Sequence, residues 1–395
     1  MLFSSLRPED QLLICIARVD LDESTARAIR ELSSRDPFDW EYVSATAASH
    51  GVAALLAHHL QSINCEGVPH SILSRLQIDN QRNSELCFWL AGELAKIAAA
   101  MQEAGIPCIP FKGPTLAITA YGDLGLRQFT DLDLFIHAHD IARVKELLAK
   151  HGFTPVRNLS SSREAALLRF DNACAFGNEQ EVLVDVHWRF SPVYSSLPLE
   201  TDDLWQRLEK VNIGKQSLFT LSAEDLLIVL CCHGFTHEWE RLVWVCDVAT
   251  LVGRRENLDW DYLFLKAKRL GVLRIVLLGL VLGRGLGAFF PPHVLARLEE
   301  DVTANRCAEE LMTQFLTAQK NHVSLFQWLT RQLQVRERVR DKFSSLFRIA
   351  LTPRDYDWMF ASVPASLSLL YYLIRPIRMA RSASLRVLNM SSAKD

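Results

Sequence analysis

The sequence predicts an α+β fold, in which a small mixed sheet with helices lies between an N-terminal and a C-terminal helical region. Three observations support this expectation. Apolar residues recur every three or four positions up to about residue 104, short apolar runs separated by turns follow Gly105, and the helical spacing returns after about residue 200. We therefore divide the chain into three expected parts, at residues 1–100, 101–195 and 196–395.

The N-terminal part has four short segments with helical spacing, at residues 9–19, 23–32, 40–49 and 52–63. A further helix is expected to begin at Ser84, because serine can cap a helix and apolar residues from Leu86 to Met101 form one stripe. Gly105 is expected to follow the end of this helix, since glycine readily adopts the left-handed conformation found there.

The central part alternates strand-like runs with turns and helices, a pattern typical of a sheet covered by helices. In chain order we expect a strand at 106–111, a short helix at 115–121, a polar loop at 122–130, a strand at 131–137, a helix between Asp140 and Gly152, and strands at 172–176 and 181–190. In the C-terminal part the clearest helical spacing lies at residues 224–234 and 242–252.

Composition and charge indicate an ordinary globular protein. Hydrophobic residues make up 49 % of the 395 residues and charged residues 23 %, which excludes disorder of the whole chain. With 43 basic and 46 acidic residues the net charge is −3, so no overall positive field attracts nucleic acid. Nine cysteines occur without a C-x-x-C pair, and the N-terminus lacks the features of a signal peptide. We therefore expect reduced thiols and a cytoplasmic location.

Two apolar stretches, at residues 272–290 and 358–374, are the candidates for membrane contact. The second has about seventeen residues without a charge, the lower limit of a span, and Pro364 interrupts it. We therefore expect a buried or interfacial helix and not a span. The arginines that follow it, at 375, 378 and 381, suit peripheral contact with anionic lipid.

Asp131 and Asp133 are separated by one residue within the strand-like run FTDLDLFI. Because side chains alternate along a strand, both carboxylates point to the same face, while Leu132 and Leu134 point into the core. Two neighbouring carboxylates repel each other unless a cation lies between them. This pair therefore indicates a metal site.

The later run EVLVDVHW places Asp185 and His187 on the face opposite its valines. If this strand pairs with the first, Asp185 can join Asp131 and Asp133. Three oxygen donors on a rigid sheet can hold Mg²⁺ and leave positions open for phosphate oxygens. The arrangement suits phosphoryl or nucleotidyl transfer.

A possible phosphate-binding corner precedes the aspartates, where a strand runs into Lys112-Gly113-Pro114 and a short helix. Gly113 allows the backbone to approach a ligand closely, the helix N-terminus presents free N–H groups, and Lys112 adds a positive charge. Arg127, four residues before Asp131, can reach the same triphosphate. These three residues are our candidate nucleotide-binding residues.

The order of these features resembles a known family. The sequence is similar to the proteins described as uncharacterised nucleotidyltransferases, within the DNA polymerase beta superfamily. Three segments carry the resemblance: the run FKGPTLAITAYGDLGLRQFTDLDLFI with its following helix, the run VLVDVHWRF, and the helical segment at residues 225–252 with the spacing H-x₃-H-x-W-x-R-L-x-W-x₂-D. The resemblance covers roughly residues 35–285. It implies that the expected sheet is of the nucleotidyltransferase type.

The resemblance also implies roles. Asp131 and Asp133 would be the paired metal carboxylates, and Asp185 the third, which serves the attacking hydroxyl. Lys112 and Gly113 stand where the wider superfamily has Gly-Ser, a departure that bears on triphosphate binding. The implied reaction is in-line attack by an acceptor on the α-phosphate of an NTP such as ATP, with one or two Mg²⁺ ions and release of pyrophosphate.

His233 and His237 lie one helical turn apart, but a zinc site would also need a glutamate and a third ligand that the segment lacks. Two interpretations stay open for these histidines, and for His187 and Arg241: they line a substrate cleft, or they serve packing and hydrogen bonding.

Two alternatives to a nucleotidyltransferase acting on an unidentified acceptor stay open. One is a nucleotide-binding sensor or scaffold that keeps the fold without turnover. The other is a toxin-type enzyme that modifies tRNA or protein. Three retained carboxylates favour an enzyme, and the acidic net charge argues against a large RNA footprint.

Overall fold

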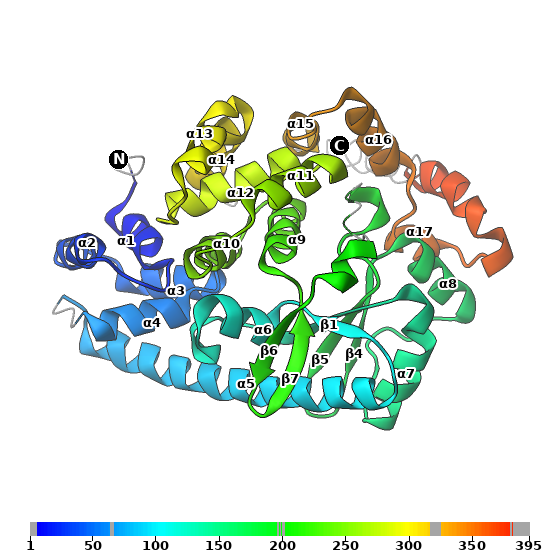
Figure 1. Cartoon of the computed structure of the whole chain (residues 1–395), viewed down its shortest axis with the longest axis horizontal. Coiled ribbons are helices and arrows are strands. Elements are labelled where there is room, and N and C mark those ends of the chain that lie inside the picture. The colour runs from blue at the N-terminus through cyan, green and yellow to red at the C-terminus, as the bar shows by residue number, and fades with distance from the viewer. Residues whose placement is uncertain are drawn as a thin grey trace, which may run out of the picture.

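Two sheets lie among many helices in the computed structural model (Figure 1). It describes residues 6–63, 67–195, 197, 199, 202–316, 325–379 and 381. A five-stranded mixed sheet and a separate two-stranded sheet are present, which confirms the predicted α+β class. The eight cysteines in the described ranges are free thiols, and Cys65 lies outside those ranges.

Five helices form the N-terminal part: α1 (Pro8–Ile16), α2 (Glu23–Ser33), α3 (Trp40–Ser49), α4 (Ala53–Ser62) and α5 (His70–Glu103). Asp22 and Asp39 cap α2 and α3 by accepting backbone hydrogen bonds. The expectation that Ser84 begins a helix is wrong, because α5 has 34 residues and Ser84 lies within it. Ile72 and Leu76 are buried and extend the apolar stripe toward the N-terminus. Gly105, with a φ of 62°, follows the end of α5 as expected.

The five-stranded sheet has the order β1-β2-β5-β4-β3, and its only parallel pair among the described residues is β2 with β5. Its strands are β1 (Cys108–Pro110), β2 (Asp131–Ile136), β3 (Thr154–Pro155), β4 (Ala173–Gly177) and β5 (Leu183–His187). The connecting helices are α6 (Gly113–Leu116), a π-helix (Ala117–Tyr121), α7 (Ile141–Lys150) and α8 (Ser161–Phe170), with 3₁₀ turns at Leu124–Leu126 and Ala138–Asp140. The sequence did not indicate β3 or α8.

The two faces of this sheet have different partners. Leu132, Leu134 and Val184 are fully buried in a cluster that also contains residues of α5 and α7. The long helix α5 runs along the bottom of Figure 1, beneath the sheet. Phe135 belongs to a second, larger cluster, which includes the N-terminal helices and much of the C-terminal part. The aspartate-bearing face of β2 is therefore turned toward the C-terminal helices.

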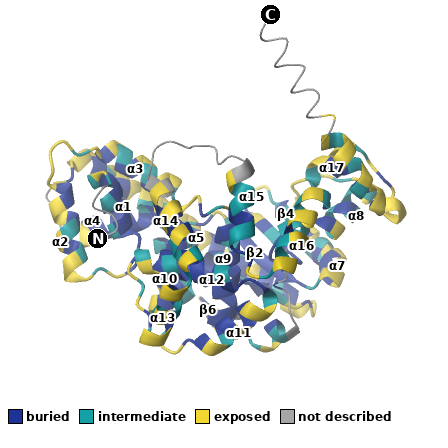
Figure 2. Ribbon diagram, turned by 90° about the horizontal axis from the view of Figure 1, so that it is seen from above, coloured by how far each residue is buried: buried dark blue, intermediate teal, exposed yellow. Residues whose placement is uncertain are grey.

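The C-terminal part begins with a β-hairpin, β6 (Glu209–Ile213) and β7 (Gln216–Thr220), where we expected only helices. Its buried residues alternate along each strand, and Gly214 in the turn has a φ of 60°. The helices that follow are α9 (Ala223–Thr236), α10 (Leu242–Arg254), α11 (Trp260–Leu270), α12 (Leu273–Gly285), α13 (Pro292–Glu300), α14 (Val302–Leu316), α15 (Leu325–Gln334), α16 (Val339–Leu351) and α17 (Asp355–Phe360). Further 3₁₀ turns lie at Val193–Ser195, Asp202–Gln206 and Ala365–Leu370. Buried residues concentrate around α9, α10 and α12 in Figure 2.

The two apolar stretches differ in their structure. Within residues 272–290, α12 is a core helix with nine buried residues. The stretch at 358–374 is not one helix, because the chain leaves α17 before Pro364 and continues as a 3₁₀ turn. Arg375 and Arg378 form ion pairs with the buried Asp357. Within the described residues, no helix is long and apolar enough to cross a membrane.

Candidate active site

The register between β2 and β5 brings the predicted acidic residues together. The two strands are parallel, with Asp133 opposite Asp185 and Phe135 opposite His187. The pairing of these strands, on which the grouping of Asp185 with Asp133 depends, is therefore present. Because side chains alternate, the carboxylates and His187 share the face that is turned away from Leu132 and Leu134.

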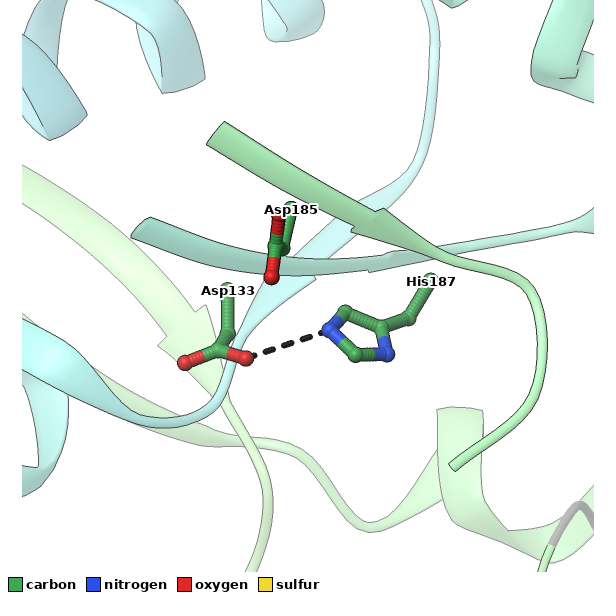
Figure 3. A group of neighbouring side chains, drawn as sticks. All are labelled: Asp133, Asp185 and His187. Atoms are coloured by element: carbon green, nitrogen blue, oxygen red, sulfur yellow. Dashed lines mark hydrogen bonds and ion pairs between the residues drawn. The ribbon is translucent and has the colours of Figure 1, made fainter. Parts of the chain in front are cut away.

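Asp133, Asp185 and His187 form a compact group whose ligand atoms all lie within 4.8 Å of one another (Figure 3). Asp133 Oδ1 and His187 Nε2 are 3.1 Å apart. The exposed fractions of Asp133 and His187 are 7 % and 8 %, and Asp185 is half-buried. Two carboxylates and an imidazole are ligands that divalent cations accept, so the donor set and its spacing fit a metal ion.

Asp131 lies at the start of β2, two residues before Asp133, outside this compact group. Burial, together with the negative charges of Asp133 and Asp185, raises the pKa of Asp131 to about 6. Burial also raises the pKa of Asp185. Both pKa values are raised because the carboxylates lie close together and have little contact with water. A bound cation would reduce the repulsion between their negative charges.

Lys112 connects the predicted phosphate corner to the acidic group. Its Nζ lies 3.5 Å from Asp133 Oδ1 and 3.4 Å from His233 Nδ1. Burial alone would raise the pKa of Asp133, but the positive charge of Lys112 and the hydrogen bond with His187 outweigh it and lower that pKa. Lys112 is therefore the immediate counter-charge of Asp133.

Gly113 has a φ of 49°, in the left-handed region that favours glycine. A Cβ atom at this position would lie 3.2 Å from the backbone oxygen of Asp131. Gly113 therefore allows the start of α6 to pass close to β2. The role that we predicted for it, close approach to a nucleotide, stays a prediction.

Arg127 lies in a buried ion pair with Asp247, a residue of α10. Its Nε and Nη2 donate to the two carboxylate oxygens of Asp247 at 2.7 and 2.9 Å. The hydroxyl of Tyr121 donates to the same carboxylate at 2.8 Å. Because the guanidinium is engaged on α10, the structure gives Arg127 a role in joining the central part to the C-terminal part. Binding of a triphosphate by Arg127 stays a prediction.

His233 of α9 contacts both Lys112, beside the acidic group, and an aromatic cluster, and His237, which follows α9, contacts the cluster. His233 Nδ1 faces Lys112, and burial followed by the charge of Lys112 holds the pKa of His233 well below its usual range. A neutral His233 can accept a hydrogen bond from the ammonium. The rings of His233 and His237 lie 4.6 Å apart, and Trp244 packs against both.

Arg241 contacts a different part of the molecule, near Gly51. It precedes α10, is exposed, and its guanidinium approaches Gly51. Burial lowers the pKa of His50, and the positive charge of Arg241 is a second, smaller cause of the same shift. The structure therefore brings His187, His233 and Lys112 to the carboxylates and leaves Arg241 beside the turn between α3 and α4.

One residue of the site, Asn172, was not singled out from the sequence. It precedes β4 and places its side-chain nitrogen 3.5 Å from His187 Nδ1. Nothing in the sequence marks it. Asp247 is the aspartate that ends the motif of the helical segment, and its pairing with Arg127 comes from tertiary structure.

In sequence, the chain is similar to a family of nucleotidyltransferases. The model of the family described as uncharacterised nucleotidyltransferases matches residues 36–286, more than half of the chain. A crystal structure of an antigenic nucleotidyltransferase-like protein from Paracoccidioides brasiliensis is similar at 17 % identity and a TM-score of 0.31, over 50 % of this chain and 92 % of that one. No curated protein matches the chain in sequence. The match to residues 36–286 shows that the chain belongs to the uncharacterised nucleotidyltransferase family.

Proposed function

We propose that the protein is a Mg²⁺-dependent nucleotidyltransferase, which transfers a nucleoside monophosphate from an NTP to an acceptor and releases pyrophosphate. Membership of the family supports the reaction class. The observation that carries the proposal is the parallel register of β2 and β5, which sets Asp133 opposite Asp185 beside Lys112.

Each residue has a proposed task. Asp131, Asp133 and Asp185 hold the cation. Lys112, Gly113 and Arg127 bind the triphosphate. When bound, the cation supplies Lewis acidity and neutralises charge on the phosphates. The acceptor hydroxyl gives its proton to Asp185. The acceptor oxygen then bonds to the α-phosphorus as the bond to the pyrophosphate oxygen breaks.

We predict that Asp133→Asn abolishes transfer without unfolding the protein, because the amide keeps the shape of the side chain and loses the charge that attracts a cation. The measurement uses α-labelled NTPs, Mg²⁺ and a cell extract as the source of acceptor, with circular dichroism to follow the fold. Asp261→Asn, an exposed acidic residue on α11, is the matched control. Label transfer that persists in Asp133→Asn contradicts the proposal.

The same assay separates the alternatives. Tight NTP binding without label transfer in any extract would indicate a nucleotide-binding sensor or scaffold. Label found on tRNA or on protein would indicate the toxin-type enzyme. Label on a small molecule with release of pyrophosphate agrees with the proposed reaction and identifies the acceptor class.

Peripheral membrane contact is a second, separate proposal. Leu369, Leu373 and Ile377 are 61, 63 and 66 % exposed near the end of the described chain. Of the three arginines predicted to contact lipid, Arg375 and Arg378 form ion pairs with Asp357, and Arg381 does not. We expect co-sedimentation with phosphatidylserine-containing vesicles that Leu373→Glu with Ile377→Glu abolishes. Leu265→Glu, at an exposed position of α11, should leave it unchanged, and equal binding by all variants would refute the contact.

A further inference from the structure

His187 lies beside the carboxylates of the candidate active site. It lies two residues after Asp185 on β5, so its side chain leaves the sheet on the same face. Figure 3 shows its Nε2 turned toward the carboxylate of Asp133, with Asp185 beside both. With 8 % of its surface exposed, His187 is fixed among the acidic residues and does not extend into solvent.

The distances within this group match one coordination sphere. Two ligands at right angles, each about 2.1 Å from one ion, are about 3 Å apart, and two opposite ligands are about 4.2 Å apart. Asp133 Oδ1 and His187 Nε2 are separated by 3.1 Å, and the three ligand atoms all fall within 4.8 Å. The contact between Asp133 and His187 fits two adjacent ligands, and the limit of 4.8 Å exceeds the span of one coordination sphere by about 0.6 Å, so a small rotation of the side chains brings all three to one ion.

The other ring nitrogen of His187 faces a side-chain amide, which carries the kind of oxygen that a metal-bound histidine requires. Such histidines donate their second N–H to an oxygen, which fixes the tautomer and the ring orientation. Here Nδ1 faces the side-chain amide of Asn172 at 3.5 Å. A 180° rotation of the side-chain amide group exchanges its nitrogen and oxygen, which have nearly the same shape, and presents the oxygen to the Nδ1–H group. Phe111 packs edge-on against the ring at 5.3 Å.

A nitrogen ligand changes which cation the site prefers. Mg²⁺ takes oxygen ligands almost always, whereas imidazole suits transition metals. We propose that His187 is a direct ligand of the bound cation, together with Asp133 and Asp185, and that the site therefore binds Mn²⁺ more tightly than Mg²⁺. This inference rests on the proposed function, but it concerns cation binding and not turnover.

The test is electron paramagnetic resonance of Mn²⁺ titrated into the full-length protein. A directly bound imidazole adds ¹⁴N modulation to the electron spin echo, and growth with ¹⁵N-histidine should replace it by the ¹⁵N pattern. The labelled wild-type protein gives this result even if a variant does not fold. Absence of a nitrogen signal in Mn²⁺-loaded wild-type protein would overturn the inference.

A matched pair of variants assigns the nitrogen. His187→Gln should lose the modulation and raise the Kd for Mn²⁺ by about tenfold or more, with a smaller change for Mg²⁺. His151→Gln, at an exposed position after α7, should behave as wild type. A nitrogen signal that survives in His187→Gln would assign the ligand to another histidine and refute the inference.

The outcomes also separate this inference from the proposed function. If Mn²⁺ binds through oxygen ligands alone, only the role of His187 fails. If neither Mn²⁺ nor Mg²⁺ binds, with or without a non-hydrolysable NTP analogue, the proposed function fails as well.

Discussion

Asp247 receives three hydrogen bonds from residues far away in the sequence, two from Arg127 and one from Tyr121. Its exposed fraction is 1 % and that of Arg127 is 6 %. We expect Asp247→Ala to lower the free energy of unfolding by about 3–5 kcal/mol, because it leaves the Arg127 cation buried without its partner. Urea denaturation followed by fluorescence measures the change.

A double variant shows whether the charge itself is the cause. Arg127→Met combined with Asp247→Leu replaces the ion pair by apolar side chains and should recover most of the lost stability. If the free energy of unfolding of Asp247→Ala lies within about 1 kcal/mol of the wild-type value, the ion pair does not hold the central and C-terminal parts together.

The predicted acidic residues show how much of a site can be predicted from sequence. The alternation of side chains along a strand was enough to place Asp131 with Asp133 on one face, whereas the addition of Asp185 also required β2 and β5 to pair. The same rule put His187 beside Asp185, although its position against Asp133 depends on strand register. The engagement of Arg127 could not be predicted, because its partner lies 120 residues later and only tertiary structure brings them together.

At the scale of elements, the hairpin β6–β7 shows why some structure was missed. Its strands have five residues each, and in each strand only two residues are buried. So few positions provide a weak alternation signal, whereas helices such as α3 and α10 repeat their apolar spacing over three turns or so and were predicted within a few residues. Helix α5 was underestimated because its first half is mostly polar and exposed.

Helix α4 is joined to the segment after α1 by a buried histidine. His59 Nε2 lies 2.7 Å from the backbone oxygen of Arg18, and its exposed fraction is 2 %. Burial lowers the pKa of His59 from 6.5 to about 4, and the hydrogen bond to Arg18 only partly opposes this. His59 is therefore neutral in the folded protein at neutral pH, and its Nε2–H donates to the carbonyl.

This pKa predicts a loss of stability in mild acid. Between pH 6.5 and about 4 the unfolded state binds a proton at His59 and the folded state does not, so the free energy of unfolding falls as the pH falls. The full effect is roughly 3 kcal/mol. Denaturation curves at several pH values should show a shallower pH dependence for His59→Gln, which keeps a donor but does not titrate. Equal slopes for both proteins would contradict this assignment.

At the scale of the whole molecule, the buried clusters cross the limits of the three expected parts. The cluster beneath the sheet includes Leu90 and Met101 of α5 and Val211 and Leu218 of the hairpin. We propose that the three parts are regions of one cooperative unit. A fragment of residues 101–195 should then show no cooperative thermal transition by calorimetry, whereas the full chain should show one. A cooperative transition in the fragment would mean that this part folds independently.

Lys112 Nζ lies 3.5 Å from Asp133 Oδ1, so the chain itself supplies a positive charge at the carboxylates. This charge lowers the pKa of Asp133 against the effect of burial. Part of the repulsion among the acidic side chains is therefore offset within the polypeptide. We expect, as a consequence, that the fold is independent of the divalent-ion concentration.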